Sequence, residues 1–201
     1  MIKLYGSNLS PFTRRCTIAL SLANIEFEFL VKMTGPDEAE LRRHNPLGRV
    51  PFLVDSDQTF VDSQTILRWL DQKTGEFRPV DKRMDLFCEE TMSIAMGTCD
   101  KGMSLYYEQT RRPPQFRYPD WMERCAWQIK DGLKALDSRC YEVHPYMFGE
   151  QLTHADIAVF VAAQFIRKTC PELNVIGTFK NIEQLEHRLL QSHPIFEETR
   201  P

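Results

Sequence analysis

The sequence predicts two domains: an α/β domain that contains a mixed four-stranded sheet, and an all-α helical bundle after it. Three observations predict this division. Short strand-like and helical segments alternate over residues 2–74, the strand signal stops after Gly75, and beyond that point apolar residues recur at helical spacing. We therefore place the first domain at 1–76, a linker at 77–82 and the helical domain at 83–201.

The first domain is predicted to have the order β-α-β-α-β-β-α. Its first helix begins at Ser10, because serine is a favoured N-cap and Pro11 suits the first helical position. Residues 55–58 have the composition of a hairpin turn. The predicted segments are strand 2–5, helix 10–24, strand 27–31, helix 37–44, strand 51–55, strand 59–61 and helix 63–74. This order is typical of a thioredoxin-like domain.

The second domain is predicted to be helical throughout. Its predicted helices are 83–109, 121–141, one that begins at Thr153, and 181–191. Thr153 and Asp156 form a variant of the capping box, and Leu152 and Ile157 flank it as a hydrophobic staple. Because these residues suit a helix start, we expect Asp156 to have a structural role.

Ser10 has two interpretations. In the first, it is an N-cap alone, whose hydroxyl accepts a hydrogen bond from the first turn of the helix. Alternatively, the hydroxyl points into a cleft beside the positive end of the helix dipole, where it donates to a thiolate and lowers the pKa of that thiol. The two interpretations require different rotamers. Tyr5 and Ser7 are neighbouring hydroxyls that would compete for the second role.

A second feature is the segment Asn45-Pro46-Leu47-Gly48-Arg49-Val50-Pro51, in which a proline stands where a strand begins. Proline cannot donate a ladder hydrogen bond, so Pro51 marks an edge, a first strand residue or a bulge. If the Val50-Pro51 bond is cis, the backbone N–H and C=O of Val50 turn away from the sheet and are free to pair with an extended ligand.

Cysteine usage excludes some thiol chemistry. Residues 10–13 (Ser-Pro-Phe-Thr) lie where a thioredoxin-like reductase carries C-x-x-C, so a dithiol oxidoreductase is not expected, and single-cysteine glutaredoxin-like chemistry is disfavoured. The six cysteines show no metal-ligand spacing and fall mostly within apolar helical patterns. We interpret them as reduced, buried residues and predict no metal site.

Charge and hydropathy argue against two further classes of protein, those that bind nucleic acids and those that span a membrane. The formal net charge is −3, and the arginine pairs at 14–15, 42–43 and 111–112 are too short to form basic patches, so nucleic-acid binding is not expected. The longest apolar run, 157–163, is far shorter than the roughly 18 residues of a membrane span. With no leader pattern before the first strand, we expect a soluble cytoplasmic protein.

The chain resembles the glutathione S-transferases over its whole length. The resemblance rests on four motifs in the family's order: Ser10-Pro11-Phe12, the Asn-Pro-x-Gly-x-Val-Pro segment, Asp62-Ser63 at the start of a helix, and the later capping box. The first and third of these are similar to the serine-type members, in particular bacterial ones and the plant tau class. The family's fold is a thioredoxin-like domain followed by a helical domain.

The resemblance implies a glutathione site and an activity. Ser10 would stabilise the thiolate of glutathione, and Val50, next to Pro51, would pair with the cysteinyl backbone. Ser63 would hold the glutamyl carboxylate and Asp62 the ammonium group. We assign Arg49 to a carboxylate, although a solvated loop cation is an equal alternative. The enzyme would then be a glutathione transferase that attacks a small hydrophobic electrophile in detoxification, with glutathione as co-substrate and no metal.

The resemblance also implies an electrophile pocket and a homodimer. The expected pocket residues are Leu9, Phe12, Met33, Met96, Met103 and Tyr106. Each of them equally suits an ordinary core position. Two alternatives to the transferase stay open: a non-catalytic binding or scaffold protein of the same architecture, and a glutathione-dependent lyase or peroxidase.

Overall fold

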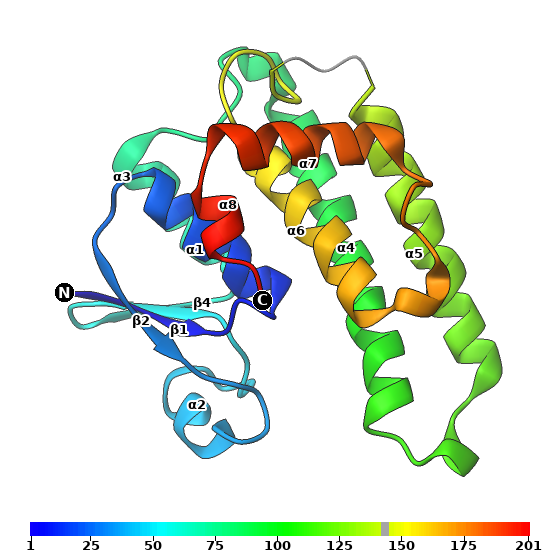
Figure 1. The fold of residues 1–201 in the computed structure, drawn as a ribbon. Coiled ribbons are helices and arrows are strands. Elements are labelled where there is room, and N and C mark those ends of the chain that lie inside the picture. Colours follow the sequence, from blue (N-terminus) through cyan, green and yellow to red (C-terminus); the bar gives the residue numbers. More distant parts are fainter. Residues whose placement is uncertain (142–144) are drawn as a thin grey trace. The chain divides into compact units, whose positions relative to one another are not determined.

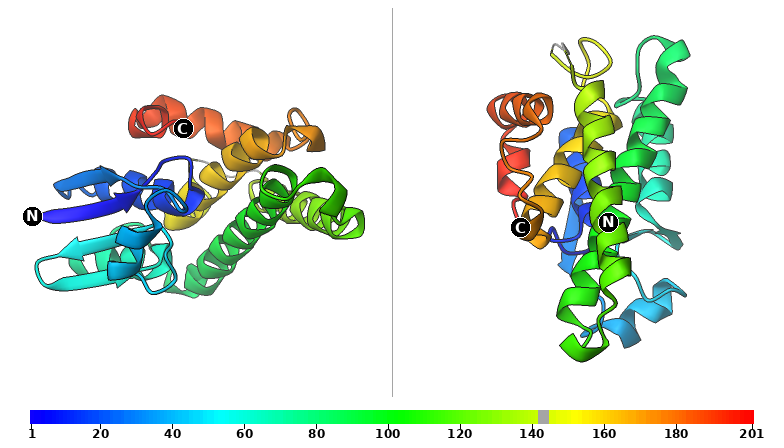
Figure 2. Two further views of the ribbon diagram at one scale, coloured as in Figure 1. Left: turned by 90° about the horizontal axis from the view of Figure 1, so that it is seen from below. Right: turned by 90° about the vertical axis from the view of Figure 1, so that its right-hand side faces the viewer.

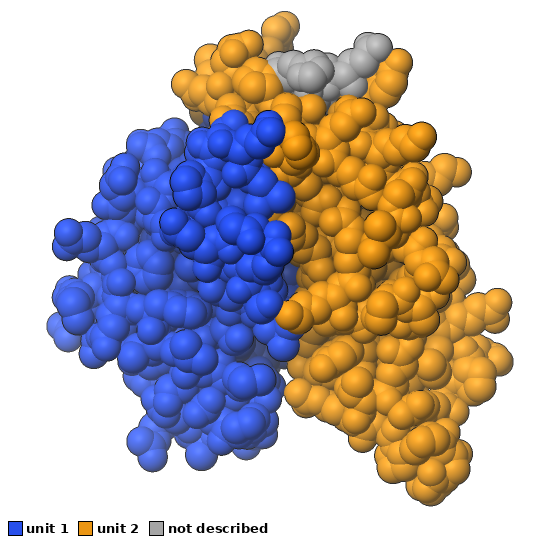
Figure 3. Space-filling model, viewed as in Figure 1, with its two compact units in different colours: residues 1–78, 190–201 blue, residues 79–189 orange. Residues whose placement is uncertain are grey.

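The computed structural model describes residues 1–141 and 145–201, and it confirms the predicted fold class of a four-stranded mixed sheet with helices followed by helices alone (Figure 1). The described chain divides into two compact units, coloured separately in Figure 3. One unit comprises Met1–Arg78 together with Leu190–Pro201, and the other comprises Pro79–Leu189. The division at 1–76, 77–82 and 83–201 stays a prediction; the compact units differ from it by grouping the last twelve residues with the first unit.

The first unit is built on a sheet with strand order β2-β1-β3-β4. Its elements are β1 (Ile2–Gly6), α1 (Pro11–Leu22), β2 (Phe27–Val31), α2 (Glu38–His44), β3 (Phe52–Asp55), β4 (Gln58–Val61), α3 (Ser63–Thr74) and α8 (Ile195–Glu198). β1 pairs parallel with β2 and antiparallel with β3, which pairs antiparallel with β4. Helices α1 and α3 pack together on one side of the sheet, and α2 lies on the other side (Figures 1 and 2).

The core of this unit consists of apolar side chains from the central strands and from α1 and α3. Its fully buried members include Leu4, Ile18, Leu20, Leu53, Ile66 and Leu70. Burial of such a side chain stabilises the fold by about 1.5–3 kcal/mol relative to exposure. This packing fixes the starts of α1 and α3 against the sheet.

Element boundaries differ from the predictions by a few residues, for local reasons. β3 begins at Phe52 and not at Pro51, which has no N–H for the ladder. Helix α1 ends at Leu22, and Asn24 beyond it takes a left-handed conformation with φ 54°. The predicted hairpin turn is confirmed: Asp55 pairs with Gln58, so Ser56 and Asp57 form a two-residue turn.

The C-terminal residues pack against α1. Arg14 is 2% exposed, and its Nη2 donates to the Phe196 carbonyl at 2.8 Å while its Nε donates to Thr199 Oγ1 at 3.3 Å. Phe196 is fully buried. These contacts explain why the last residues belong to the first unit.

The second unit is helical. Its main helices are α4 (Asp85–Thr110), α5 (Pro119–Arg139), α6 (His154–Thr169) and α7 (Lys180–Ser192), of which residues 190–192 belong to the first unit. Short 3₁₀ turns are η1 (Lys82–Met84), η2 (Pro114–Phe116) and η3 (Pro171–Leu173). α4 packs against both α5 and α6. Glycines allow the close approach: a Cβ on Gly102 would lie 2.4 Å from Ile166 Cδ1, and one on Gly132 would lie 2.2 Å from Thr98 Oγ1.

Two helix starts of this unit, those of α6 and α7, are capped by side chains. The predicted capping box of α6 is confirmed: the Thr153 hydroxyl and the Asp156 carboxylate bond each other's backbone N–H. Asp137 at the end of α5 caps α7 from outside, because its Oδ1 accepts from the N–H groups of Asn181 and Ile182 at 2.9 and 3.0 Å. Both arrangements satisfy N–H groups that a helix start leaves without partners.

Over residues 1–141 and 145–201, none of the helices combines the length and the hydropathy that a membrane crossing requires.

Candidate functional site

The strand register brings three of the predicted motifs to one end of the sheet. Tyr5, Phe52 and Val61 form one row across β1, β3 and β4, because Tyr5 pairs with Phe52 and Phe52 pairs with Val61. β1 runs out of this row towards Ser10, β3 enters it from Val50-Pro51, and β4 leaves it directly into Asp62-Ser63. The topology therefore gathers segments from three parts of the sequence at this end of the sheet.

Ser10 is the N-cap of α1. Its Oγ accepts from the Thr13 N–H at 3.3 Å, and its own N–H donates to the Ser7 carbonyl at 2.9 Å. A hydroxyl that accepts one hydrogen bond still has a hydrogen to donate. No group in the described part of the chain accepts that hydrogen, so the capping rotamer leaves the donor of Ser10 available at the positive end of the helix dipole.

The two neighbouring hydroxyl residues lie before the helix start, Tyr5 on β1 and Ser7 in the loop that follows it. The ring of Tyr5 stacks on Phe52, with centroids 4.3 Å apart, and lies 5.7 Å from the ring of His44. Ser7 Oγ accepts from the Leu9 N–H at 3.3 Å, which shapes the loop before α1. Ser10 is the hydroxyl of the three that sits at the helix start itself.

The segment before β3 is shaped by a buried asparagine. Asn45 is 4% exposed; its Nδ2 donates to the Arg49 carbonyl at 2.9 Å, and its Oδ1 accepts from the Leu47 N–H at 3.0 Å. The Val50-Pro51 peptide bond that follows is cis. Among residues 1–141 and 145–201, no hydrogen-bond partner is found for the N–H or C=O of Val50, which lies outside the ladder.

The start of α3 carries an exposed acid and a buried hydroxyl. Asp62 is the N-cap, with a φ of 74°, and its Oδ1 accepts from the Gln64 N–H at 2.7 Å. Ser63 is 1% exposed, and its Oγ accepts from Arg15 Nη2 at 2.7 Å. Arg15 Nη2 also lies 3.4 Å from Gln64 Oε1. A guanidinium on α1 thus contacts the first two residues of α3.

The remaining predicted residues fall into two groups. The Arg49 side chain is exposed on the loop before Val50. Of the expected electrophile-pocket residues, Leu9, Phe12 and Met33 belong to the first unit, and Met96, Met103 and Tyr106 lie on α4 in the second. Met96 is 9% exposed and Met33 is 47% exposed, so burial varies widely within this set. Their joint role stays a prediction.

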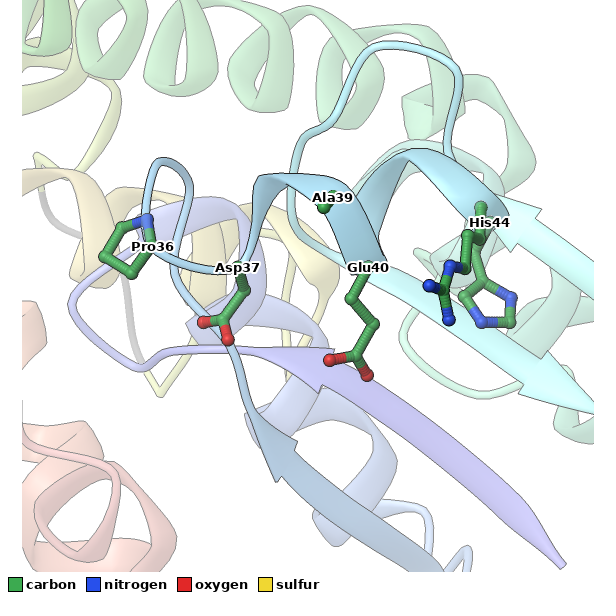
Figure 4. A pocket seen from close by; sticks show the side chains of 6 residues that line it. Pro36, Asp37, Ala39, Glu40 and His44 are labelled. Carbon is green, nitrogen blue, oxygen red and sulfur yellow. The ribbon is translucent and has the colours of Figure 1, made fainter.

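A separate pocket of about 420 Å³ lies along α2 (Figure 4). It is lined by Pro36, Asp37, Ala39, Glu40, Arg43 and His44. Lys32 pairs with two of the acids here, at 2.6 Å from Glu40 and 3.6 Å from Asp37. Figure 4 shows both carboxylates directed to the same side of the helix. No residue predicted for the thiol site lines this pocket.

The cysteines contribute no reactive thiolate near these loops. All six are free and buried. Burial raises the pKa of the Cys16 thiol, on α1, to about 12, although the Arg15 charge opposes that rise. A thiol with this pKa stays protonated at neutral pH. Among the residues that the structure describes, no cluster of three His, Cys, Asp or Glu side chains could hold a metal ion.

Two residues of this region were missed by sequence reasoning. The sequence pattern presents Arg15 only as half of a short basic pair with Arg14, and Asn45 only as part of a longer motif. A signal for Arg15 existed, because the next five residues, 16–20, carry no charged side chain, and a helix that is apolar on most sides is buried. The partners of Asn45 are backbone groups, which every residue has, so the sequence does not indicate which of them Asn45 bonds.

Comparison with known proteins agrees with the fold and with its two parts. Residues 4–78 match the glutathione S-transferase N-terminal domain, and residues 119–198 match the glutathione S-transferase C-terminal domain. The chain is 36% identical over 176 residues to glutathione S-transferase Z2 of Arabidopsis thaliana, covering 81% of this chain and 74% of the relative. It is 28% identical over 175 residues to the GST-like protein YibF of Escherichia coli, covering 85% of each.

Solved structures give the same result. A glutathione S-transferase from Methylobacterium radiotolerans, in complex with glutathione sulfonate, superposes with a TM-score of 0.92 at 25% identity, covering 100% of this chain and 94% of that one. One from Methylobacillus flagellatus with glutathione bound has a TM-score of 0.92 at 23% identity and covers both chains fully. On the matches to both of its domains and to these relatives, the chain belongs to the glutathione S-transferase family.

Proposed function

We propose that this protein binds glutathione at the end of the sheet where Ser10, Val50 and Asp62-Ser63 meet. It activates the glutathione thiol as a thiolate for attack on a small hydrophobic electrophile. The observation that carries the proposal is the strand register, which brings these three segments to the same end of the sheet. Relatives of the same fold have been solved with glutathione or glutathione sulfonate bound.

Each part of the peptide has a partner of matching chemistry in this proposal. The N–H and C=O of Val50 pair with the cysteinyl backbone, as a one-residue strand addition. The glutamyl carboxylate lies at the N-terminal end of α3 near Ser63, where the helix dipole favours an anion. Asp62, exposed at the same turn, faces the glutamyl ammonium group, and Arg49 pairs with the glycyl carboxylate.

Ser10 then acts on the thiol. Its hydroxyl keeps its capping bond to Thr13 and donates its free hydrogen to the sulfur. A hydrogen bond to the charged form lowers a pKa, and each unit of lowering corresponds to about 1.4 kcal/mol of preference for the thiolate. The proton leaves to solvent, and the thiolate attacks an electrophilic carbon. A carbon–sulfur bond forms as a halide leaves, an epoxide carbon–oxygen bond opens or the π bond of an unsaturated carbonyl breaks. No covalent bond between protein and substrate forms.

The electrophile site and the assembly are further parts of the proposal. The electrophile is held by Leu9, Phe12, Met33, Met96, Met103 and Tyr106, and the protein is a homodimer on the strength of its family membership. Sedimentation at several concentrations tests the dimer; a monomer throughout would exclude it. The six buried free cysteines fit a reducing, cytoplasmic location.

The experiment that tests the function has two stages. Titration calorimetry with glutathione is expected to give saturable binding, and a panel of aromatic halides, epoxides and unsaturated carbonyls is expected to include members that are conjugated. Absence of glutathione binding would exclude the enzyme and favour a scaffold protein. Binding with hydroperoxide reduction but no conjugation would favour a peroxidase.

A further inference from the structure

Arg15 is a buried cation whose guanidinium meets the start of α3. It is 2% exposed, and its Nη2 donates to Ser63 Oγ at 2.7 Å, within the range of a strong charge-assisted hydrogen bond. The same nitrogen lies 3.4 Å from Gln64 Oε1. Arg15 and Ser63 are 48 positions apart in the sequence, so this contact links the two helices whose starts form the proposed site.

The direction of this hydrogen bond determines what Ser63 can do. A guanidinium has donors and no acceptor, so Ser63 Oγ must be the acceptor. The serine hydrogen is then directed away from Arg15. No described group of the chain accepts it. Ser63 is thereby held as a donor, polarised by the positive charge behind it.

The charge itself adds to the effect. Electrostatic interactions are stronger in the protein interior than in water, so a cation buried beneath the first turn of α3 favours an anion bound at that turn. The helix dipole acts in the same sense at the same place. Neither effect requires the guanidinium to touch the ligand.

The adjacent residue provides an internal comparison. Arg14 is also 2% exposed on α1, but its guanidinium points to the C-terminal residues, where it bonds the Phe196 carbonyl and Thr199 Oγ1. Two neighbouring buried arginines therefore have different partners: Arg14 fixes the end of the chain, and Arg15 fixes the start of α3.

We propose that Arg15 is a positioning residue for the glutamyl carboxylate of glutathione: it holds the Ser63 hydroxyl as a donor and supplies positive charge beneath it. This inference rests on the proposed function, in which glutathione is bound at this turn. It predicts that Arg15 makes the site selective for ligands that carry this carboxylate.

The test compares two ligands, glutathione and γ-aminobutyryl-cysteinylglycine, which lacks only the glutamyl α-carboxylate. Wild type is expected to prefer glutathione. Arg15→Gln is expected to weaken glutathione binding at least about tenfold, the effect of losing a hydrogen bond that involves a charge. Its affinity for the decarboxylated ligand should change less than about twofold, because that ligand has no group for Ser63 to bind.

Arg14→Gln is the matched control. It removes a guanidinium of equal burial from the same helix, so it is expected to lower the melting temperature while leaving the ratio of the two affinities as in wild type. Should Arg15→Gln fail to fold, Arg15→Lys takes its place. Lysine keeps the charge but not the planar fork, so partial loss of the preference for glutathione is expected.

The outcomes separate the two proposals. If wild type binds neither ligand, the proposed function fails and this inference fails with it. If wild type binds glutathione and the Arg15 variant loses affinity for both ligands by the same factor, Arg15 is merely structural and only this inference is overturned. Loss confined to glutathione supports it.

Discussion

Two helix starts in this chain look alike in sequence, and they differ in what their hydroxyls do. At α6 the Thr153 hydroxyl accepts from the Asp156 N–H and donates to Asp156 Oδ2 at 2.7 Å, so both of its functions are used. At α1 the Ser10 hydroxyl accepts from the Thr13 N–H, and its hydrogen has no acceptor within the described residues.

The two helix starts also differ in the burial of their capping residues. Thr153 and Asp156 are fully buried, whereas Ser10 is partly exposed. A saturated, buried cap stabilises the fold, and a cap that keeps a free donor near the surface can also bind a ligand. A hydroxyl residue at a helix start can therefore have a structural or a functional role, and the role depends on whether its hydroxyl hydrogen already has an acceptor.

The largest expected effect comes from breaking the saturated start. Asp156→Ala removes the acceptor of the Met147 and Thr153 N–H groups, at 2.8 Å each, and Asp156 itself is fully buried. We expect a loss of about 3 kcal/mol or more in the free energy of unfolding, because buried donors are left without partners. Urea denaturation measures this loss.

The affinity of the folded Asp156→Ala protein for glutathione should match that of wild type, since this carboxylate serves the fold. The free energy of unfolding of Asp156→Asn, which keeps one acceptor oxygen and the shape, should lie between those of wild type and Asp156→Ala. A glutathione affinity that falls in the variant at a temperature where it is fully folded would contradict the division between the two helix starts.

An intermediate effect is expected at Gly6, where β1 passes under the start of α1. A Cβ added there would lie 2.4 Å from Thr13 Oγ1 and 2.5 Å from Thr13 Cγ2, so Gly6→Ala must displace the Thr13 side chain in the first turn of α1. We expect a destabilisation of about 1–3 kcal/mol, as for overpacking elsewhere, together with weaker thiolate stabilisation. Thermal unfolding and the pKa of bound glutathione report the two effects.

Gly97→Ala on α4 is the control for Gly6→Ala, because nothing lies within 4 Å of its added Cβ. Alanine is the better helix former, so this variant should be as stable as wild type or more so. Equal stability of the Gly6→Ala and Gly97→Ala variants would contradict the close approach of β1 and α1.

The smallest effect is expected at Glu108, a second buried acid of the helical unit. The Tyr118 N–H, at 2.9 Å, and Arg112 lower the pKa of this carboxyl below its usual value of 4.5. The Glu108 carboxyl is therefore protonated at a higher pH in the unfolded chain than in the folded protein. The stabilisation from Glu108 is present above about pH 4.5 and is lost as the pH falls below it.

Glu108→Gln should reduce stability slightly at neutral pH and flatten the fall in stability on the acid side. Melting temperatures over a pH series measure this. Parallel curves for wild type and variant would show that Glu108 does not titrate with folding.

Local sequence patterns predicted most of the fold. N-caps, turn residues and apolar periodicity located the strands and helices to within a few residues, because these signals act between neighbours in the chain. They also located Ser10 and Val50 as candidates, and the resemblance to the family added Asp62-Ser63. Whether the hydroxyls are saturated could not be predicted, since this depends on partners that folding brings together.

Arg15 illustrates the limit. Its partner Ser63 lies on another helix, and no local pattern distinguishes it from Arg14, whose partners lie at the far end of the chain. Asn45 is similar in kind, because its role is to bond the backbone of a loop. Long-range polar contacts of buried side chains were thus the part that the sequence did not reveal.

The most direct test of the central claim is the pKa of the thiol of bound glutathione, titrated by the ultraviolet absorbance of the thiolate. In wild type we expect it to lie at least about one unit below the value near 8.5 of a free thiol. In Ser10→Ala it should return towards that value, while Ser10→Thr, which keeps the hydroxyl and the cap, should retain the lowered pKa. The same pKa in wild type and Ser10→Ala would contradict the account.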